Sequence, residues 1–279
     1  MKLTVPTEPY PSNTVVNVVA NPSAGFQFLH WLGDLTGNNA TDSVTMTRNK
    51  SVRAVFGTTL GTGVSGSGSV SNQPMLALYP FGSTVKLTAV PQVGSFFSSW
   101  SNPMNSTNNP VDFVVASANP SVIASFAPLI GGEFALTVIA DGYGQVGANP
   151  SGNHFLNGTV VQLTATPEVG QSFLGWSGGA SGSNIPLSVV LDASKTITAN
   201  FTRRPTLAIS PGDVLPGTDG VRVTVRGAPG AVFEIDGKSV LTDPWLPIGM
   251  VTNEFGETQF LDTTATDGTQ RYFRALVMP

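Results

Sequence analysis

The chain has 279 residues, which at about 100–200 residues per domain favours two to four modules over a single one. Only 11% of the residues are charged, against about 25% in an ordinary globular protein, while 41% are hydrophobic. This balance excludes global disorder, and the 13 scattered Lys and Arg residues cannot form a phosphate-binding stripe for nucleic acid. No apolar run of about 18 residues is present, so nothing in the sequence is expected to insert into a membrane. The absence of Cys removes disulfides, thiolate nucleophiles and Cys-type zinc sites.

An aromatic motif, Pro-x-x-Gly-x-x-Phe-x-x-Trp, recurs three times at spacings of 69 and 76 residues. Its members are Pro22, Gly25, Phe28 and Trp31, then Pro91, Gly94, Phe97 and Trp100, then Pro167, Gly170, Phe173 and Trp176. In each copy a strand-like segment precedes the motif (16–20, 85–89, 161–165) and another closes the copy (51–56, 121–126, 196–201). A fixed period identifies a repeat architecture. The sequence therefore predicts three copies of one small β-rich module, at residues 1–57, 58–130 and 131–202.

Each copy is predicted to consist of a turn, a strand and an aromatic core. Asn13, Gly82 and Gly158 stand at one equivalent place before the first strand, where a tight turn requires positive φ. The strand that follows alternates at period two with β-branched residues, as a half-buried strand does. The Phe and Trp of the motif are expected to fill the core of each copy. The Gly-, Asn- and Ser-rich stretch after each Trp is expected to be an exposed loop that varies in length.

The third copy carries the pattern most completely, from Asn157 to Trp176 and on to its closing segment 196–201. This pattern resembles the divergent internalin-B-type repeats of bacterial surface and secreted proteins, and the resemblance covers residues 1–202. It implies tandem β-rich modules on exported proteins, used as stalks or accessory domains, and it brings no catalytic residues. Copies 1 and 2 depart from it after the Trp, where Leu32-Gly33-Asp34 and Ser101-Asn102-Pro103 stand. The loops of these two copies are therefore expected to differ in shape.

Copies 2 and 3 each open on an additional Gly-rich or β-type segment, at residues 61–71 and 134–147, for which copy 1 has only a few residues. We therefore expect the opening strand of copy 1 to be missing or shortened, and the natural protein to continue upstream with further domains. Residues 1–10 contain no apolar stretch of the kind that a signal peptide needs. On this interpretation the chain is a C-terminal part of an extracellular or cell-surface protein.

The sequence changes character after Phe201, and residues 205–279 do not carry the repeat. Residues 1–204 hold eight basic and eight acidic side chains, whereas the last segment holds five and nine, so the net charge of −4 lies in that segment. Alternation at 220–226, a tight hairpin around Asp236-Gly237, and strands at 258–261 and 271–277 predict a small β-sandwich. Its ending is similar to the terminal β-domain of exported proteins of verrucomicrobial type, which implies extracellular display. The predicted fold class is all-β: three tandem modules followed by a sandwich-like domain at 205–279.

Residues suited to catalysis or metal binding are sparse. The two histidines, His30 and His154, lie at non-equivalent positions, and neither has partners at the spacing of a catalytic triad or a metal site. Asp34, Asp112 and Glu168 are not repeated from copy to copy, which argues against a repeated carboxylate pair for glycoside hydrolysis. Loop acids of the last domain offer oxygen ligands to calcium but lack a D-x-D-x-D spacing; they are Asp213, Asp219, Asp236, Asp243, Asp262 and Asp267. We expect surface or boundary histidines and turn or cap acids, and predict no enzyme activity, no cofactor and no metal site.

Aromatic residues offer a ligand chemistry of their own. Tyr10, Tyr79 and Phe155 share one equivalent position shortly before the turn of each copy, and Trp245 lies in a Pro-rich loop of the last domain. Rings spaced along a neutral Ser-, Thr- and Asn-rich surface can stack on sugars; alternatively, the first three cover the edges of their cores and Trp245 packs under its loop.

Two functional hypotheses follow from the sequence. The first is a non-catalytic extracellular module array that serves as a stalk, adhesion or display segment. The second is a carbohydrate-binding accessory region of a secreted polysaccharide-degrading enzyme, whose partner is a polysaccharide or a cell-surface glycan.

Overall fold

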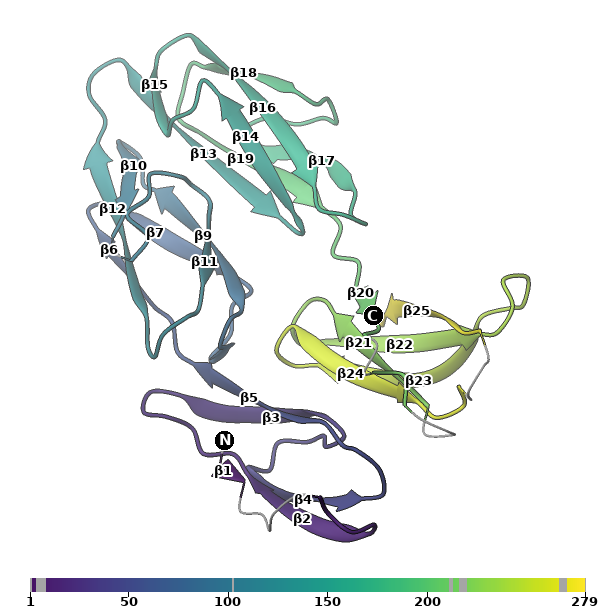
Figure 1. Ribbon diagram of the computed structural model, residues 1–279. Coiled ribbons are helices and arrows are strands. Elements are labelled where there is room, and N and C mark those ends of the chain that lie inside the picture. The colour runs from purple at the N-terminus through teal and green to yellow at the C-terminus, as the bar shows by residue number, and fades with distance from the viewer. Residues whose placement is uncertain are drawn as a thin grey trace. The chain divides into compact units, whose positions relative to one another are not determined.

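The computed structural model describes residues 2–3, 9–101, 103–210, 213–215, 220–265 and 270–278, and shows an all-β protein (Figure 1). These described residues contain no α-helix, and so none that is long and apolar enough to cross a membrane. The chain forms two compact units: unit 1 comprises residues 1–59, 76–81 and 205–279, and unit 2 comprises residues 60–75 and 82–204. Unit 1 thus holds copy 1 with the C-terminal domain, and unit 2 holds most of copy 2 with copy 3.

Copies 2 and 3 are each built from two small sheets. The strands of copy 2 are β6 (Gly61–Ser65), β7 (Gly68–Gln73), β8 (Tyr79–Pro80), β9 (Thr84–Pro91), β10 (Ser95–Trp100), β11 (Val111–Val114) and β12 (Ser121–Pro128). Those of copy 3 are β13 (Glu133–Asp141), β14 (Gly144–Asn149), β15 (His154–Leu156), β16 (Thr159–Pro167), β17 (Phe173–Gly178), β18 (Leu187–Leu191) and β19 (Lys195–Phe201). The sheet orders are β10-β12-β6 and β11-β9-β7 in copy 2, and β15-β13-β19-β17 and β14-β16-β18 in copy 3. In both copies the opening strand, β6 or β13, runs parallel to the closing strand, β12 or β19.

Copy 1 has the same plan with two strands fewer among its described residues. Its strands are β1 (Lys2–Leu3), β2 (Thr14–Val19), β3 (Gln27–Gly33), β4 (Thr41–Met46) and β5 (Val52–Thr58), in the sheets β1-β2-β4 and β3-β5-β8. The strand β8 comes from the sequence of copy 2 but lies in unit 1, where Tyr79 pairs with Thr58. Its counterpart in copy 3 is β15, where Phe155 pairs with Phe134.

The core of every copy contains the same three rings in the same arrangement. The Phe and Trp of the motif have ring centroids 5.0 Å apart in copy 1, 5.1 Å in copy 2 and 5.2 Å in copy 3. A second Phe, from the closing strand, lies 6.0, 6.2 and 5.6 Å from the first. The Trp side chains are 1%, 1% and 4% exposed for Trp31, Trp100 and Trp176. These contacts make the motif the centre of each module.

A β-bulge allows Phe and Trp to share this core although they are three residues apart. On a regular strand, residues i and i+3 point to opposite faces of the sheet. Each copy has a register shift between the two rings, at Phe28/His30, Phe97/Ser99 and Phe173/Gly175. The extra residue of a bulge moves the side chains that follow it to the opposite face of the sheet. Phe and Trp therefore point to the same face, into the core.

The loop after each Trp is more uniform than the sequence indicates. Each indole N–H donates to the carbonyl oxygen of the Asn eight residues later, at 2.7 Å for Asn39, 2.9 Å for Asn108 and 2.8 Å for Asn184. Each Trp backbone N–H also donates to a carbonyl six residues later. The spacing from each Trp to this acceptor is therefore the same, because the buried indole N–H requires it, and the expected variation in loop length falls between the acceptor and the next strand. Asn102, one of the departures in copy 2, lies outside the described residues.

The expected turns are present. Asn13, Gly82 and Gly158 have φ values of 66°, 85° and 82°. Two further glycines, Gly68 and Gly144, begin β7 and β14 under the Phe of the closing strand, where an added Cβ would come within 2.3 and 2.5 Å of the ring. Any larger residue there would displace the core.

The C-terminal domain has two three-stranded sheets, β20-β21-β24 and β23-β22-β25. Their strands are β20 (Thr206–Ala208), β21 (Val221–Arg226), β22 (Ala231–Lys238), β23 (Leu246–Asn253), β24 (Glu257–Asp262) and β25 (Tyr272–Val277). The predicted tight hairpin at Asp236-Gly237 is wrong, because both residues lie within β22. A bulge follows Ile235, and the buried carboxylate of Asp236 accepts a hydrogen bond from Arg274 on β25 at 2.8 Å. This ion pair holds a typical turn residue inside a strand.

Candidate functional site

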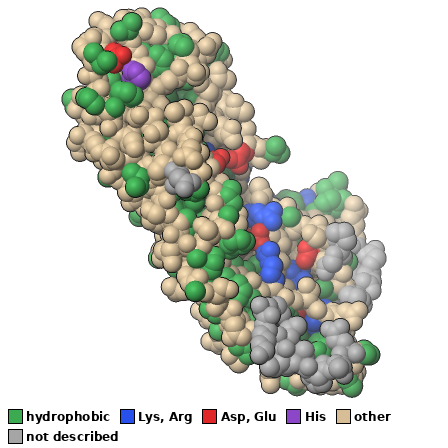
Figure 2. All heavy atoms as spheres, turned by 60° about the vertical axis from the view of Figure 1, so that its left-hand side comes forward, with side chains coloured by type: hydrophobic (Ala, Val, Ile, Leu, Met, Phe, Trp, Pro, Cys, Tyr) green, Lys and Arg blue, Asp and Glu red, His purple; other side chains and the backbone are tan. Residues whose placement is uncertain are grey.

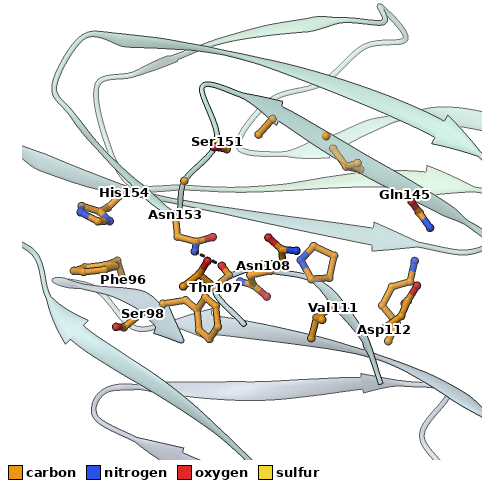
Figure 3. A pocket seen from close by; sticks show the side chains of 18 residues that line it. Phe96, Ser98, Thr107, Asn108, Val111, Asp112, Gln145, Ser151, Asn153 and His154 are labelled. Atoms are coloured by element: carbon orange, nitrogen blue, oxygen red, sulfur yellow. Dashed lines mark hydrogen bonds between the residues drawn. The ribbon is translucent and has the colours of Figure 1, made fainter. Parts of the chain in front are cut away.

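A groove of about 690 Å³ lies across copies 2 and 3 within unit 2 (Figure 3). Copy 2 lines it with Lys86, residues 96–98 of β10 and the segment 107–112. Copy 3 lines it with residues 145–148 of β14 and the segment 151–154. Its volume lies in the range of about 300–1,000 Å³ that is typical of small-molecule sites. We refer to it as the inter-copy groove.

One end of the inter-copy groove is aromatic. The rings of Phe96 and His154 have centroids 3.8 Å apart and planes inclined by 31°, and both side chains are half-buried. Figure 3 shows the pair together at one end of the groove. At the position of Phe96, copies 1 and 3 carry Gln27 and Ser172, so the ring is specific to copy 2.

Two hydrogen bonds join the copies at this groove. The side-chain amide of Asn153 donates to the carbonyl of Thr107 at 3.0 Å, and the ammonium group of Lys86 donates to the carbonyl of Gly144 at 2.6 Å. Copies 2 and 3 therefore build the groove together.

The rest of the groove carries polar groups with spare hydrogen-bonding capacity. Within the part of the chain that the structure describes, the side chains of Asn108, Gln145 and Asp112 make no hydrogen bond or ion pair. Figure 3 shows Asn108 in the middle of the groove, and Gln145 and Asp112 at the end away from the aromatic pair. Amide and carboxylate groups of this kind can exchange hydrogen bonds with hydroxyl groups.

The four aromatic residues proposed from the sequence as sugar platforms do not line this groove. Tyr79 is 1% exposed, so its ring offers no free face to a sugar, and its hydroxyl accepts a hydrogen bond from the Leu76 backbone N–H at 3.2 Å. Tyr10 and Phe155 are half-buried and pack against the cores of copies 1 and 3. Trp245 is half-buried, and the cationic groups of Lys238 and Arg274 lie over its ring, at 4.5 and 4.9 Å from the centroid. Its ring is thus already engaged with two cations.

The titratable residues of the described ranges lie mostly apart or in pairs. No group of three or more His, Asp or Glu residues that could hold a metal ion occurs there. The expectation of turn or cap acids is wrong for Asp236 and Asp262, which lie within β22 and at the end of β24 and are buried and paired with Arg274 and Arg271. Asp219 and Asp267 lie outside the described residues.

The C-terminal domain docks on copy 1 within unit 1 through a buried charge cluster. The carboxylate of Asp34 faces Arg48, Lys50 and Arg222, and Arg222 in turn faces Asp213 at 3.6 Å. The side chains of Asp34 and Arg222 are 4% and 6% exposed and lie 3.2 Å apart. Burial alone raises the pKa of Asp34, but the hydrogen bonds from Arg48 and the Ser51 N–H, with the charge of Arg222, outweigh it and lower the pKa below its ordinary value. Asp34 is therefore held ionised.

A smaller recess of about 300 Å³ lies beside this cluster, between copy 1 and the C-terminal domain. His30 stacks on Phe255 there, with centroids 5.4 Å apart and planes inclined by 9°. Burial lowers the pKa of His30, against the opposing effect of Glu254. The backbone N–H of Gly33 donates to the Gln259 side chain at 2.8 Å. The recess is thus part of the docking interface.

Charged side chains are few on the face of the molecule shown in Figure 2, where uncharged polar groups and backbone predominate. A ligand of this surface would be held through hydrogen bonds and ring contacts more than through long-range attraction.

The repeats and their shared core define a tandem β-module protein. The family model of the divergent InlB B-repeat domain matches residues 2–60, 58–129 and 134–205, and the chain belongs to this family of bacterial surface repeats. Members of this family are typically non-catalytic. A comparison with curated proteins gives no match.

Proposed function

We propose that the chain is a non-catalytic module array that serves as a stalk or display segment of a bacterial surface or secreted protein. The observation that carries this proposal is the threefold recurrence of one aromatic core, with the same Phe-Trp contacts and the same indole hydrogen bond in every copy. A repeated core of this kind is typical of a structural scaffold. A catalytic protein would instead gather residues with perturbed pKa values at one site.

Export and display test this proposal directly. The chain is fused at one end to an export signal and a surface anchor, and it carries an epitope at the other end. Whole cells are then labelled with an antibody against this epitope. The expected result is efficient labelling, with background rates on ester, peptide and glycoside substrates. Turnover that disappears in the His30→Ala or His154→Ala variant would show an active site and overturn the proposal.

A second candidate function, carbohydrate binding, is favoured by the chemistry of the inter-copy groove. The groove combines an aromatic pair at one end with the unengaged polar side chains of Asn108, Gln145 and Asp112. We propose that a short neutral glycan lies along it, with a sugar ring against Phe96 and hydroxyl groups on the amides. Contacts of this size correspond to dissociation constants from about 1 mM to 1 μM, or about −4 to −8 kcal/mol.

Retention on neutral polysaccharides checks this second function. Phe96→Ala and Asn108→Ala are each expected to weaken retention about tenfold, because they remove the stacking surface and a hydrogen-bonding amide. Gln92→Ala, which alters an exposed side chain of the same copy outside the groove, is the matched control and should retain the polysaccharide as the parent chain does. Retention that is lost between 50 and 200 mM salt, or that is the same in all variants, would contradict glycan binding in this groove.

A further inference from the structure

The opening and closing strands of copy 3 lie side by side and run parallel (Figure 1). Six residues of β13 pair with six of β19, from Leu136 opposite Lys195 to Asp141 opposite Asn200. The chain therefore enters copy 3 at one end of this pair of strands and leaves at the other. Tension on the two ends of copy 3 pulls β13 and β19 past each other along their length, which loads all the hydrogen bonds between them at once. We call β13 and β19 the clamp pair.

The clamp pair is protected from water. It occupies the middle of the sheet β15-β13-β19-β17, so each of its strands has a further strand on its outer side. The inward side chains of both strands are buried in the core of copy 3; they are Leu136, Val138 and Ala140, and Ile197, Ala199 and Phe201. Hydrogen bonds are stronger in such low-dielectric surroundings, because water does not compete for their donors and acceptors.

Side-chain contacts join the two strands of the clamp pair at both ends. At the end where the chain enters, the backbone N–H of Ala135 donates to the hydroxyl of Ser194 at 3.0 Å. At the end where it leaves, Arg203 forms an ion pair with Asp141, the last residue of β13. These contacts resist the first displacement of one strand along the other.

Copy 2 has the same parallel topology in a less protected form. Its opening strand β6 pairs with β12 over Gly61–Ser65, but β6 lies at the edge of its sheet and its residues are exposed or half-buried. Ser65 and Pro128 stand at the positions of Asp141 and Arg203, so the ion pair has no counterpart there. Copy 3 is therefore the better built of the two to carry tension.

We propose that copy 3 is a force-bearing module, in which the clamp pair resists tension applied along the chain. The inference rests on the proposed function as a stalk, because a stalk that joins a displayed part to a surface carries tension. The rate of forced unfolding depends on the barrier to separating the strands, and that barrier depends on the direction in which they are pulled.

Single-molecule pulling on the full chain in two directions tests the proposal. The chain has no Cys of its own, so handles can be attached to two introduced Cys residues at exposed positions. Gly131→Cys with Arg204→Cys pulls the strands of the clamp pair past each other. Gly131→Cys with Ala193→Cys pulls the same strands apart from one end, so that their hydrogen bonds break one after another. Both pairs of handles lie in copy 3, which keeps the force on this module.

We expect an unfolding force at least about threefold higher in the first direction than in the second, at the same pulling speed. The unfolded length identifies the module, because residues 131–204 extend to about 240–260 Å. Both variants should melt at the temperature of the parent chain, so that the difference in force reports the direction alone. Equal forces in the two directions, or a lower force in the first, overturn the proposal. Cell-surface labelling is measured separately, so a chain that is displayed but shows no directional resistance contradicts the clamp and leaves the display function standing.

Discussion

Replacement of Trp176 by Ala is expected to destabilise copy 3 by about 3–5 kcal/mol, the usual cost of removing a large buried aromatic side chain. The indole is 4% exposed, contacts Phe173, and donates to the Asn184 carbonyl at 2.8 Å. The variant therefore leaves a cavity and an unpaired carbonyl at the start of the loop. Because small domains are only marginally stable, a loss of this size should leave copy 3 largely unfolded near its former melting temperature. Denaturant unfolding with amide exchange resolved by segment measures the effect.

Leu174→Ala is the matched control for this experiment. Leu174 lies on the same strand, two residues away, and is 64% exposed, so its loss should change stability little. Trp176→Phe keeps a ring but removes the N–H, and it should cost less than the Ala variant. If Trp176→Ala and Leu174→Ala were equally stable, the ring could not be the centre of the module.

The repeated core could be predicted from the sequence because large aromatic residues and turn residues recur at fixed positions. Phe and Trp recur at fixed places in three copies, and such large aromatic side chains are stable only when they are buried in a core. Asn13, Gly82 and Gly158 mark turns that need positive φ. The bulge between the two rings could not be predicted with the same certainty, because period-two counting places residues i and i+3 on opposite faces. A spacing of three between two large core residues on one strand is the signal that indicates it.

The loops illustrate a different limit. The stretches after Trp31, Trp100 and Trp176 differ in sequence, yet each supplies an Asn carbonyl to the indole eight residues earlier. A backbone acceptor can be supplied by many sequences, so composition does not reveal it. The Asn residues at these three positions are nevertheless a repeated sequence feature, which identical spacing from the Trp brings out.

The inter-copy groove and the docking of the C-terminal domain depend on contacts between modules, which no local pattern records. Their sequence signals are the places where one copy differs from the others. Phe96 is the aromatic residue that copies 1 and 3 lack, and Asp34 stands where copies 2 and 3 have Pro103 and Gly179. Positions at which one copy differs from the others thus indicate contact surfaces between modules. Positions at which the copies agree indicate residues of the shared core.

Asp34→Asn is expected to loosen the docking of the C-terminal domain on copy 1, at a cost of about 3–5 kcal/mol, because it leaves buried Arg222 with only the more distant carboxylate of Asp213, at 3.6 Å. Arg48 and Lys50 also lose a partner, so three cations remain together. Faster amide exchange is expected in residues 33–35 and 257–262, while the core around Trp31 stays protected. Asp192→Asn, which alters an exposed acid paired with Lys195, is the control and should show no measurable change.

The pH dependence of the same variant provides an independent check. The folded protein lowers the pKa of Asp34 from 3.8, so the unfolded chain binds its proton first as the pH falls. The stabilisation from this carboxylate is therefore fully present above about pH 3.8 and is lost as the pH falls through the lower, folded pKa. The difference in unfolding free energy between the parent chain and Asp34→Asn should be largest near neutral pH and should shrink below pH 3.8. A difference that stayed constant down to strongly acidic pH would show that Asn at this position acts through packing, and the charge cluster would then not be what holds the domain in place.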